Sequence, residues 1–239
     1  MTTRNPEDFD GSQQEVEALA IGLAFVAGYV DTVGFVALFG LFTAHVTGNF
    51  VLIGATLARS TGNVLLKLLV FPAFVLAVGI TRFVVVWMDQ RGQPALRPLL
   101  FGQLVLLIGF GCFGWAASPA IESNAPLVLW TGILGGAAMG VQNAAARLVL
   151  SSATPTTVMT GNVTQLVIDC VDLALGVGNS KVRRRAIKFF WSIAAFAIGA
   201  VAGGFGTVAM NFASLIIPVT VVAWLAISQT RSDLQTQMS

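Results

Sequence analysis

Charge is scarce in this sequence. Of its 239 residues, 10% are Asp, Glu, Lys or Arg and 56% are hydrophobic, and the mean hydropathy is +0.82. A soluble domain carries roughly 25% charged residues, so this chain has too little charge to cover a surface in water. The composition argues against a soluble enzyme or a nucleic-acid-binding protein and predicts a chain that lies in a lipid bilayer.

Cysteine and histidine are also rare, which limits the chemistry available. The two cysteines, Cys112 and Cys170, lie in apolar stretches. We expect buried, inert thiols there rather than a disulfide framework or a Cys-rich zinc site. His45 is the single histidine, and it cannot complete the ligand set of a metal alone. We therefore predict no metal and no cofactor.

Recognisable catalytic motifs are absent as well. The chain has no Walker loop and no nucleophile–base–acid set. The run G-F-G-C-F-G at 109–114 has the spacing of a dinucleotide fingerprint, but it lies within an apolar stretch. We expect no catalytic residues and a protein that is not an enzyme.

Long apolar runs fill most of the chain, without the two-residue alternation of a membrane β-barrel. A helix needs about 20 mostly apolar residues to cross a bilayer, and six windows qualify. They lie at residues 18–42, 63–88, 98–118 and 125–146, with two more inside 189–230 that we expect to be divided near Met210-Asn211.

Two further segments each contain a T-G-N triplet, Thr47-Gly48-Asn49 and Thr160-Gly161-Asn162. After each triplet about eleven to sixteen residues can be helical, and eleven residues reach roughly half a bilayer. We predict broken or re-entrant helices. Irregular backbone at membrane depth has to be buried in protein or line a cavity.

The chain repeats itself. The two triplets are 113 residues apart, and Gly28-Tyr29-Val30-Asp31 aligns with Gly140-Val141-Gln142-Asn143 at an offset of 112. We predict duplication, with the domains divided as a polar cytoplasmic tail (1–17), repeat 1 (18–118), repeat 2 (119–230) and a cytoplasmic tail (231–239).

Loop charges favour a cytoplasmic N-terminus. With six full spans, ten of the twelve basic residues outside the spans fall on the cytoplasmic side, as the positive-inside rule requires. Eight crossings would place nine there. We favour six spans because the T-G-N segments are short. Six spans make the two halves inverted, whereas eight would make them parallel.

The T-G-N triplets are our predicted solute site. A Thr or Asn side chain can cap a helix N-terminus, Gly lets a ligand approach the backbone, and the free N–H groups carry partial positive charge. Two such helices from inverted halves would meet near the midplane, where the lining would be Thr47, Gly48, Asn49, Thr160, Gly161 and Asn162. Alternatively, the triplets are only cap-and-turn devices that let broken helices pack.

Other polar residues within the apolar runs are further candidates. Asp31, in the middle of the first span, is predicted to couple protons or contact an ion, or else to pair with Arg82. His45 can titrate near neutral pH, or can simply be a polar residue at the membrane surface. Gln142 and Asn143 either line the cavity opposite Asp31 or hold helices together.

Charged residues near the second triplet have plainer expected roles. We expect Arg147 to anchor the cytoplasmic end of its helix. The basic run at 181–188 is predicted to contact anionic lipid rather than nucleic acid. Asp169 and Asp172 are expected to form a solvated or cavity-facing pair.

The motifs carry a family resemblance. Gly28-x-x-Asp31-x-x-Gly34-Phe35, then Phe42-x-Ala44-x-x-Thr47-Gly48-Asn49, and the second triplet together resemble the YoaK-like family of bacterial membrane proteins over about residues 18–228. The resemblance implies a polytopic protein of the bacterial cytoplasmic membrane. The family is one of unknown function, so it supplies no substrate and no active residues.

We therefore expect an all-α membrane protein with six transmembrane helices and two short re-entrant helices in two inverted repeats. Its expected function is secondary transport, or a channel, for a small polar solute or ion. The competing hypothesis is a non-transporting membrane assembly or sensor subunit. The expected partners are the lipid bilayer and the solute, with no nucleic acid, and a homo-oligomer is compatible with the sequence.

Overall fold

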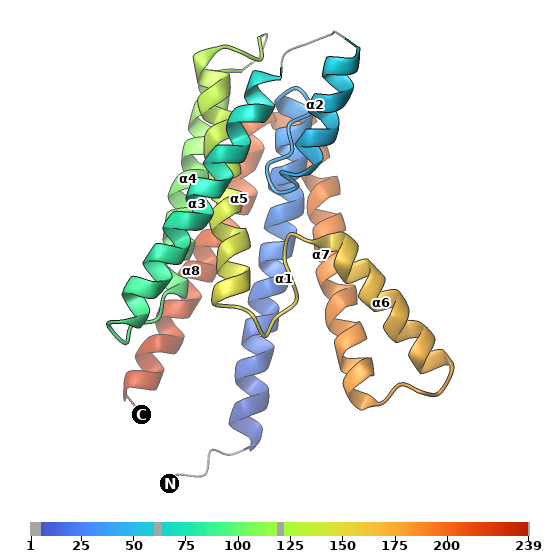
Figure 1. Ribbon diagram of the computed structural model, residues 1–239. Helices are drawn as coiled ribbons and strands as arrows, with labels where there is room; N and C mark the ends of the chain where they lie inside the picture. Colours follow the sequence, from blue (N-terminus) through green and yellow to red (C-terminus); the bar gives the residue numbers. More distant parts are fainter. Residues whose placement is uncertain (1–5, 60–63, 119–121, 239) are drawn as a thin grey trace.

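The computed structural model describes residues 6–59, 64–118 and 122–238, and the side chains among them from residue 14 to residue 229. These residues form helices and contain no strand, so the predicted all-α class is confirmed. The helices, drawn in Figure 1, are α1 (Pro6–Ala37), α2 (Gly48–Ala58), α3 (Leu65–Asp89), α4 (Leu96–Ala116), α5 (Pro126–Leu148), α6 (Met159–Ala174), α7 (Ser180–Met210), the 3-10 helix η1 (Asn211–Leu215) and α8 (Ile216–Met238).

Four segments of the described chain are long and apolar enough to cross a membrane. They are Gln14–Ala37, Leu65–Asp89, Leu96–Ala116 and the 50-residue Ser180–Gln229. The last of these contains α7 and the first part of α8. Asn211, with a φ of 52°, and the 3-10 helix that follows it divide the two helices at the predicted break.

α5 has 23 residues, enough in length for a span, but it is not among the four apolar segments. Its many Gly and Ala residues, followed by Gln142 and Asn143, make it less apolar than its neighbours. The first helix differs from expectation in another way. α1 begins at Pro6, so most of the segment that we predicted as a polar tail continues this helix.

The glycines let two pairs of helices approach closely. A Cβ on Gly28 of α1 would overlap the carbonyl oxygen of Phe196 on α7. A Cβ on Gly140 of α5 would lie 2.9 Å from the carbonyl oxygen of Phe74 on α3. The α1–α7 and α3–α5 contacts are the most extensive in the molecule, because at these points backbone packs against backbone.

The two short helices begin inside the bundle and run toward opposite ends of it (Figure 1). α2 has 11 residues and α6 has 16, which are the lengths the sequence predicts. The loop before α2 packs on α5, where a Cβ at Gly135 would lie 3.0 Å from Thr43. The loop before α6 packs on α1, where Leu150 joins a buried cluster with Leu19 and Leu23. The loop before α2 thus contacts α5, and the loop before α6 contacts α1.

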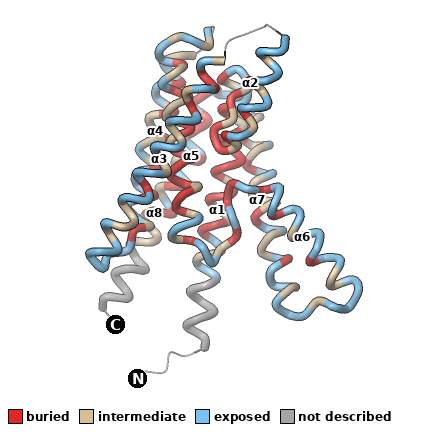
Figure 2. The backbone as a smooth tube through the Cα atoms, in the orientation of Figure 1, coloured by how far each residue is buried: buried red, intermediate tan, exposed pale blue. Residues whose placement is uncertain are grey.

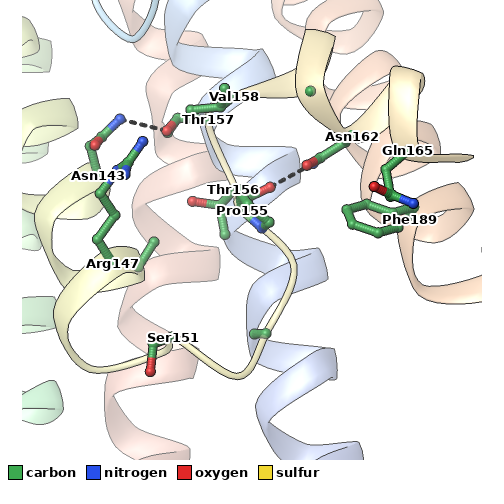
Figure 3. A pocket seen from close by; sticks show the side chains of 13 residues that line it. Asn143, Arg147, Ser151, Pro155, Thr156, Thr157, Val158, Asn162, Gln165 and Phe189 are labelled. Carbon is green, nitrogen blue, oxygen red and sulfur yellow. Dashed lines mark hydrogen bonds between the residues drawn. The ribbon is translucent and has the colours of Figure 1, made fainter. Parts of the chain in front are cut away.

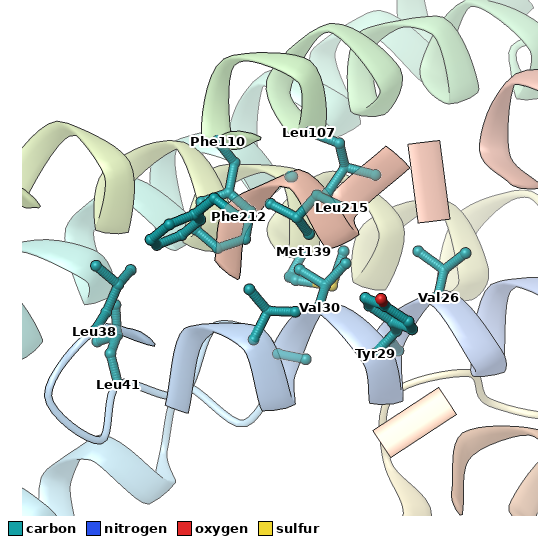
Figure 4. Close-up of a cluster of buried hydrophobic side chains, with 14 of the residues drawn as sticks. Val26, Tyr29, Val30, Leu38, Leu41, Leu107, Phe110, Met139, Phe212 and Leu215 are labelled. Carbon is teal, nitrogen blue, oxygen red and sulfur yellow. The ribbon is translucent and has the colours of Figure 1, made fainter. Parts of the chain in front are cut away.

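The main apolar core lies where α1, α4, α5 and η1 meet (Figure 4). Tyr29, Phe110 and Phe212 are among its largest fully buried side chains. The Tyr29 hydroxyl donates to the carbonyl oxygen of Ser214 at 3.0 Å, so the polar end of this side chain is satisfied. Burial is concentrated in the middle of the bundle, as Figure 2 shows.

The outer faces of the helices are exposed and apolar, with Phe83 69% exposed and Val208 82% exposed. This is the distribution that suits lipid around the bundle. It also corrects one expectation, because Cys112 and Cys170 are both exposed rather than buried. An apolar run in a membrane protein faces lipid as readily as it faces the core, so apolar surroundings in sequence do not imply burial.

Candidate functional site

The loop before α2 is held by Asp31, which is 4% exposed on α1. The backbone N–H groups of Thr43 and Ala44 each donate to Asp31 Oδ1 at 2.7 Å. The other carboxylate oxygen lies 2.6 Å from His45 Nδ1. Asp31 therefore pairs with His45 and not with Arg82, which is exposed on α3. Both carboxylate oxygens of Asp31 are therefore bound to groups of the loop.

His45 sits in this loop, outside the spanning helices, with 39% of its side chain exposed. The hydrogen bond to Asp31 raises the pKa of His45 above its ordinary value of 6.5, although burial acts in the opposite direction. The ring also packs edge-on against Phe196 of α7, with ring centroids 5.7 Å apart. The imidazole thus connects the loop to two helices.

Asn49 closes the same loop on itself. Its Oδ1 accepts from the N–H of Phe42 at 2.9 Å, and its Nδ2 donates to the Phe42 carbonyl oxygen at 2.7 Å. Asn49 is only 1% exposed. Both ends of the amide are thus bonded within the protein.

The loop before α6 is held by amides in place of a carboxylate. Asn143 Nδ2 donates to the Thr157 hydroxyl at 2.7 Å, and Gln142 Nε2 donates to the Thr156 hydroxyl at 3.2 Å. Gln142 is fully buried, and it also donates to the carbonyl oxygen of Leu23 and accepts from Gln103. Gln142 therefore joins α1, α4, α5 and the loop.

Asn162 closes the second loop much as Asn49 closes the first. Its Nδ2 donates to the Pro155 carbonyl oxygen at 2.7 Å, seven residues earlier, which is also the separation between Asn49 and Phe42. Proline has no N–H group, so the return bond of the first loop has no counterpart. Asn162 is 1% exposed, whereas Thr160 and Gly161 are exposed.

The expected capping role of the Thr and Asn side chains is wrong. Thr47 precedes α2 but makes no side-chain cap bond, and α6 begins at Met159 with Val158 before it. The physical reason is that each Asn side chain turns back to its own loop, where it donates to the carbonyl oxygen of Phe42 or Pro155, instead of facing the free N–H groups of the first turn.

A cavity of about 440 Å³ lies beside the second triplet (Figure 3). It is bounded by the end of α5, the loop and the start of α6, with Phe189 of α7 on the far side. Three predicted site residues line it: Asn143, Gly161 and Asn162. The predicted lining residues Thr47, Gly48, Asn49, Thr160 and Gln142 are not among its lining residues.

Sequence reasoning missed several residues of this region. The hydroxyl groups of Thr156 and Thr157 receive the amides of α5, and Pro155, Arg147 and Ser151 line the cavity. Extending the alignment of the two halves beyond the triplets would have brought out the first three positions, because they occupy the places of Thr43, Ala44 and Phe42.

Charged groups around the second loop are mostly paired. Asp169, which is fully buried, accepts two hydrogen bonds from Arg185, at 2.6 and 2.8 Å, and one from Gln165. It is therefore neither solvated nor cavity-facing, which corrects that expectation. Glu17 of α1 accepts from Lys188 at 2.8 Å and from the Thr154 hydroxyl at 3.3 Å.

The first loop also has a charged contact that the sequence did not indicate. Lys67 of α3 is 7% exposed, and its ammonium group donates to the carbonyl oxygen of Phe39 at 2.7 Å. Phe39 and Gly40 have positive φ values of 55° and 72°. Lys67 thus satisfies a carbonyl at the tight turn that ends α1.

The sequence matches a known family over most of its length. Residues 19–228 match the model of the family described as "Protein of unknown function (DUF1275)". The chain belongs to this family. The predicted YoaK-like resemblance is thereby confirmed, over the range of residues that the motifs indicated.

One curated relative is named as a transmembrane protein. The chain is 28% identical over 149 residues to the "UPF0700 transmembrane protein YoaK" of Bacillus subtilis (strain 168). The alignment covers 62% of this chain and 64% of the relative, slightly less than two thirds of its length. No solved structure matches the chain. With its apolar helices, the chain is a membrane protein of this transmembrane family.

Proposed function

We propose that this protein is a secondary transporter or channel that carries a small polar solute or ion across the bacterial cytoplasmic membrane. Its site is the 440 Å³ cavity beside the second triplet. Six spans and two re-entrant helices, arranged as two inverted repeats, surround this site. The protein is not an enzyme, and its partners are the bilayer and the solute.

The repeat is supported by matched contacts. Exchanging α1–α4 with α5–α8 turns the α1–α7 pair into the α5–α3 pair, and these are the two most extensive contacts. The same exchange places Gly28 and Phe196 on Gly140 and Phe74, which pack in the same way. The chain directions in Figure 1 are opposite for α1 and α5, for α2 and α6, for α3 and α7, and for α4 and α8. This is what an inverted repeat predicts.

The cavity is the observation that carries the proposal. It brings Asn143, the last residue of the predicted repeat motif Gly140–Asn143, together with Gly161 and Asn162 at the start of a half-length helix. Transporters with inverted repeats often place their substrate where such a discontinuous helix begins inside the bundle. Its volume suits a small molecule.

A specific observation favours the competing hypothesis, a non-transporting assembly or sensor subunit. Asn49, Asn162 and Gln142 each make hydrogen bonds to other groups inside the protein. In that case the triplets only let broken helices pack. Asp31→Asn and Asn49→Ala would then lower stability or complex formation, and no solute would bind.

The test uses purified protein in liposomes with acetate, phosphate, urea, glycerol and potassium chloride as solutes. Gly161→Leu puts a bulky side chain at the cavity wall, where a Cβ would meet only Val158, at 3.9 Å. Leu favours a helix more than Gly does, so the fold is expected to persist. We expect solute flux to fall close to that of empty liposomes.

Gly54→Leu is the matched control. Gly54 lies on α2, the other half-length helix, and a Cβ there would meet nothing within 4 Å. Its flux should equal that of the unmodified protein. Unchanged flux in Gly161→Leu would reject the cavity as the path, and an absence of flux in the unmodified protein would favour the non-transporting hypothesis.

A further inference from the structure

We propose that the solute held in this cavity is a small anion, a carboxylate or a phosphate, and that Arg147 recognises its charge. The inference rests on the proposed function and names the substrate class of the same cavity. Arg147 was expected only to anchor the end of α5. The structure places it in the cavity wall, with its side chain directed toward Asn143 and Thr157 (Figure 3).

Arg147 carries the charge of the cavity by itself. Among the described residues that line the cavity there is no acid and no other base. Arg147 makes no ion pair or hydrogen bond with any described residue, and it is exposed, so its guanidinium group is accessible. A guanidinium presents several N–H donors in a planar fork that fits a carboxylate or a phosphate.

The acids around the cavity are already neutralised by other bases. Asp169 on α6 is held by Arg185, and Glu17 on α1 is held by Lys188. Neither approaches Arg147 closely enough to pair with it. Positive charge at the cavity wall is therefore left without an internal partner, and a bound anion would supply one.

The lining next to Arg147 offers neutral donors that an anion can use. The Ser151 hydroxyl lies in the wall and makes no hydrogen bond with another described residue. Asn143 donates one of its two amide hydrogens to the Thr157 hydroxyl, and the second amide hydrogen can be donated to an anion. Neutral donors beside a single cation favour a small anion over a cation.

The first half shows what this space looks like when it is closed. At the offset of 112 that aligns Asp31 with Asn143, Phe35 takes the place of Arg147. The equivalent Asn bonds place Phe42 where the second half has Pro155. The rings of Phe35 and Phe42 pack together with centroids 4.8 Å apart. The second half therefore has a charge and an opening where the first half has an aromatic plug.

Binding is tested with the full-length protein in detergent, by following its melting temperature against acetate, inorganic phosphate, urea and glycerol. We expect acetate or phosphate to raise the melting temperature, and urea and glycerol to give no protection. Arg147→Gln should weaken anion binding about tenfold or more, since a hydrogen bond to a charged group contributes roughly 1.5–3 kcal/mol. Arg147→Lys should recover part of the binding.

Arg183→Gln is the control for net charge, because Arg183 is exposed on α7 and does not line the cavity. It should bind anions as the unmodified protein does. Pro155→Phe is the second variant. It brings the ring and the N–H group of the first half into the second, so it should close the cavity and abolish anion binding without loss of stability.

Three outcomes overturn the inference. One is protection by uncharged solutes alone. Another is unchanged anion binding in Arg147→Gln. The third is Arg147-dependent protection by phosphatidylglycerol nanodiscs, relative to phosphatidylcholine, with no response to free anions, which would assign the site to a lipid headgroup. The proposed function fails separately. Arg147-dependent anion binding without flux overturns transport alone, and Gly161→Leu-sensitive flux of an uncharged solute overturns the anion alone.

Discussion

The loop before α2 is held by a carboxylate that binds its backbone, whereas the loop before α6 is held by two amides that bind its threonine side chains. Asp31 accepts from the N–H groups of Thr43 and Ala44. Asn143, which matches Asp31, donates to the hydroxyl of Thr157, and the neighbouring Gln142 donates to the hydroxyl of Thr156. The helix side chain accepts hydrogen bonds from backbone N–H groups in the first loop. In the second loop the helix side chains donate hydrogen bonds to threonine hydroxyl groups.

The same arrangement of a loop before a short helix is closed in one case and open in the other. The first loop has a charged anchor, a reciprocal Asn49–Phe42 pair and an aromatic plug. The second has neutral anchors, a single bond from Asn162 and an open cavity. The first loop is thus closed by its own contacts, whereas the second loop leaves a cavity that a solute can enter.

The largest expected difference between the loops is in stability, when the side chain that holds each loop is removed separately. Asp31→Ala leaves two buried N–H groups without acceptors, and each such group costs about 1–3 kcal/mol. We expect a loss of about 3 kcal/mol or more in the free energy of unfolding in detergent. Asn143→Ala removes one amide–hydroxyl bond and should cost about 1 kcal/mol.

Asp31→Asn refines the measurement, because it keeps the size and one acceptor oxygen while removing the charge. Its loss should lie between those of the two alanine variants. Equal losses for Asp31→Ala and Asn143→Ala would show that the charged anchor has no special weight, and the comparison between the loops would fail.

The helical scaffold was largely predictable, since apolar length and short polar breaks follow directly from membrane thickness. Residues 63–88 and 125–146 were predicted as spans, and they correspond to α3 and α5. The division near Asn211 was predicted as well. The sequence could not show which face of a helix meets lipid, so the exposure of Cys112 was missed.

The candidate site was predicted only in part. Asn143, Gly161 and Asn162, which the sequence singled out in the predicted repeat motifs, line the cavity. The sequence could not show that Asn162 would turn back onto its loop. Side-chain partners depend on the path of the intervening backbone, which the triplet itself does not specify.

A second way to sharpen the comparison is pH, because only the first loop contains a titrating pair. The hydrogen bond to Asp31 raises the pKa of His45 in the folded protein. Protonated His45 therefore adds stability that is fully present below about pH 6.5, the value for an unfolded histidine. This stability is lost as pH rises through the folded pKa.

The free energy of unfolding, measured across this window, should fall with rising pH in the unmodified protein. His45→Gln should flatten that part of the profile, and Asn143→Ala should leave its slope unchanged because Asn143 does not titrate. A slope that survives in His45→Gln would place the titrating group elsewhere and remove the charged pair as a distinction between the loops.

The smallest expected effect concerns the two triplet glycines, which report how full each loop is. A Cβ at Gly48 would lie 3.1 Å from the ring of Phe42, so the ring has to shift. A Cβ at Gly161 would meet Val158 at an ordinary 3.9 Å. Ala is favoured over Gly in a helix by up to about 1 kcal/mol. Gly161→Ala should therefore stabilise the protein slightly, while Gly48→Ala should gain nothing or lose stability. The contrary result is equal stabilisation by both substitutions in thermal unfolding. It would show that the ring of Phe42 is not packed tightly against the first triplet, and the contrast between the two loops would then rest on the cavity beside Gly161 alone.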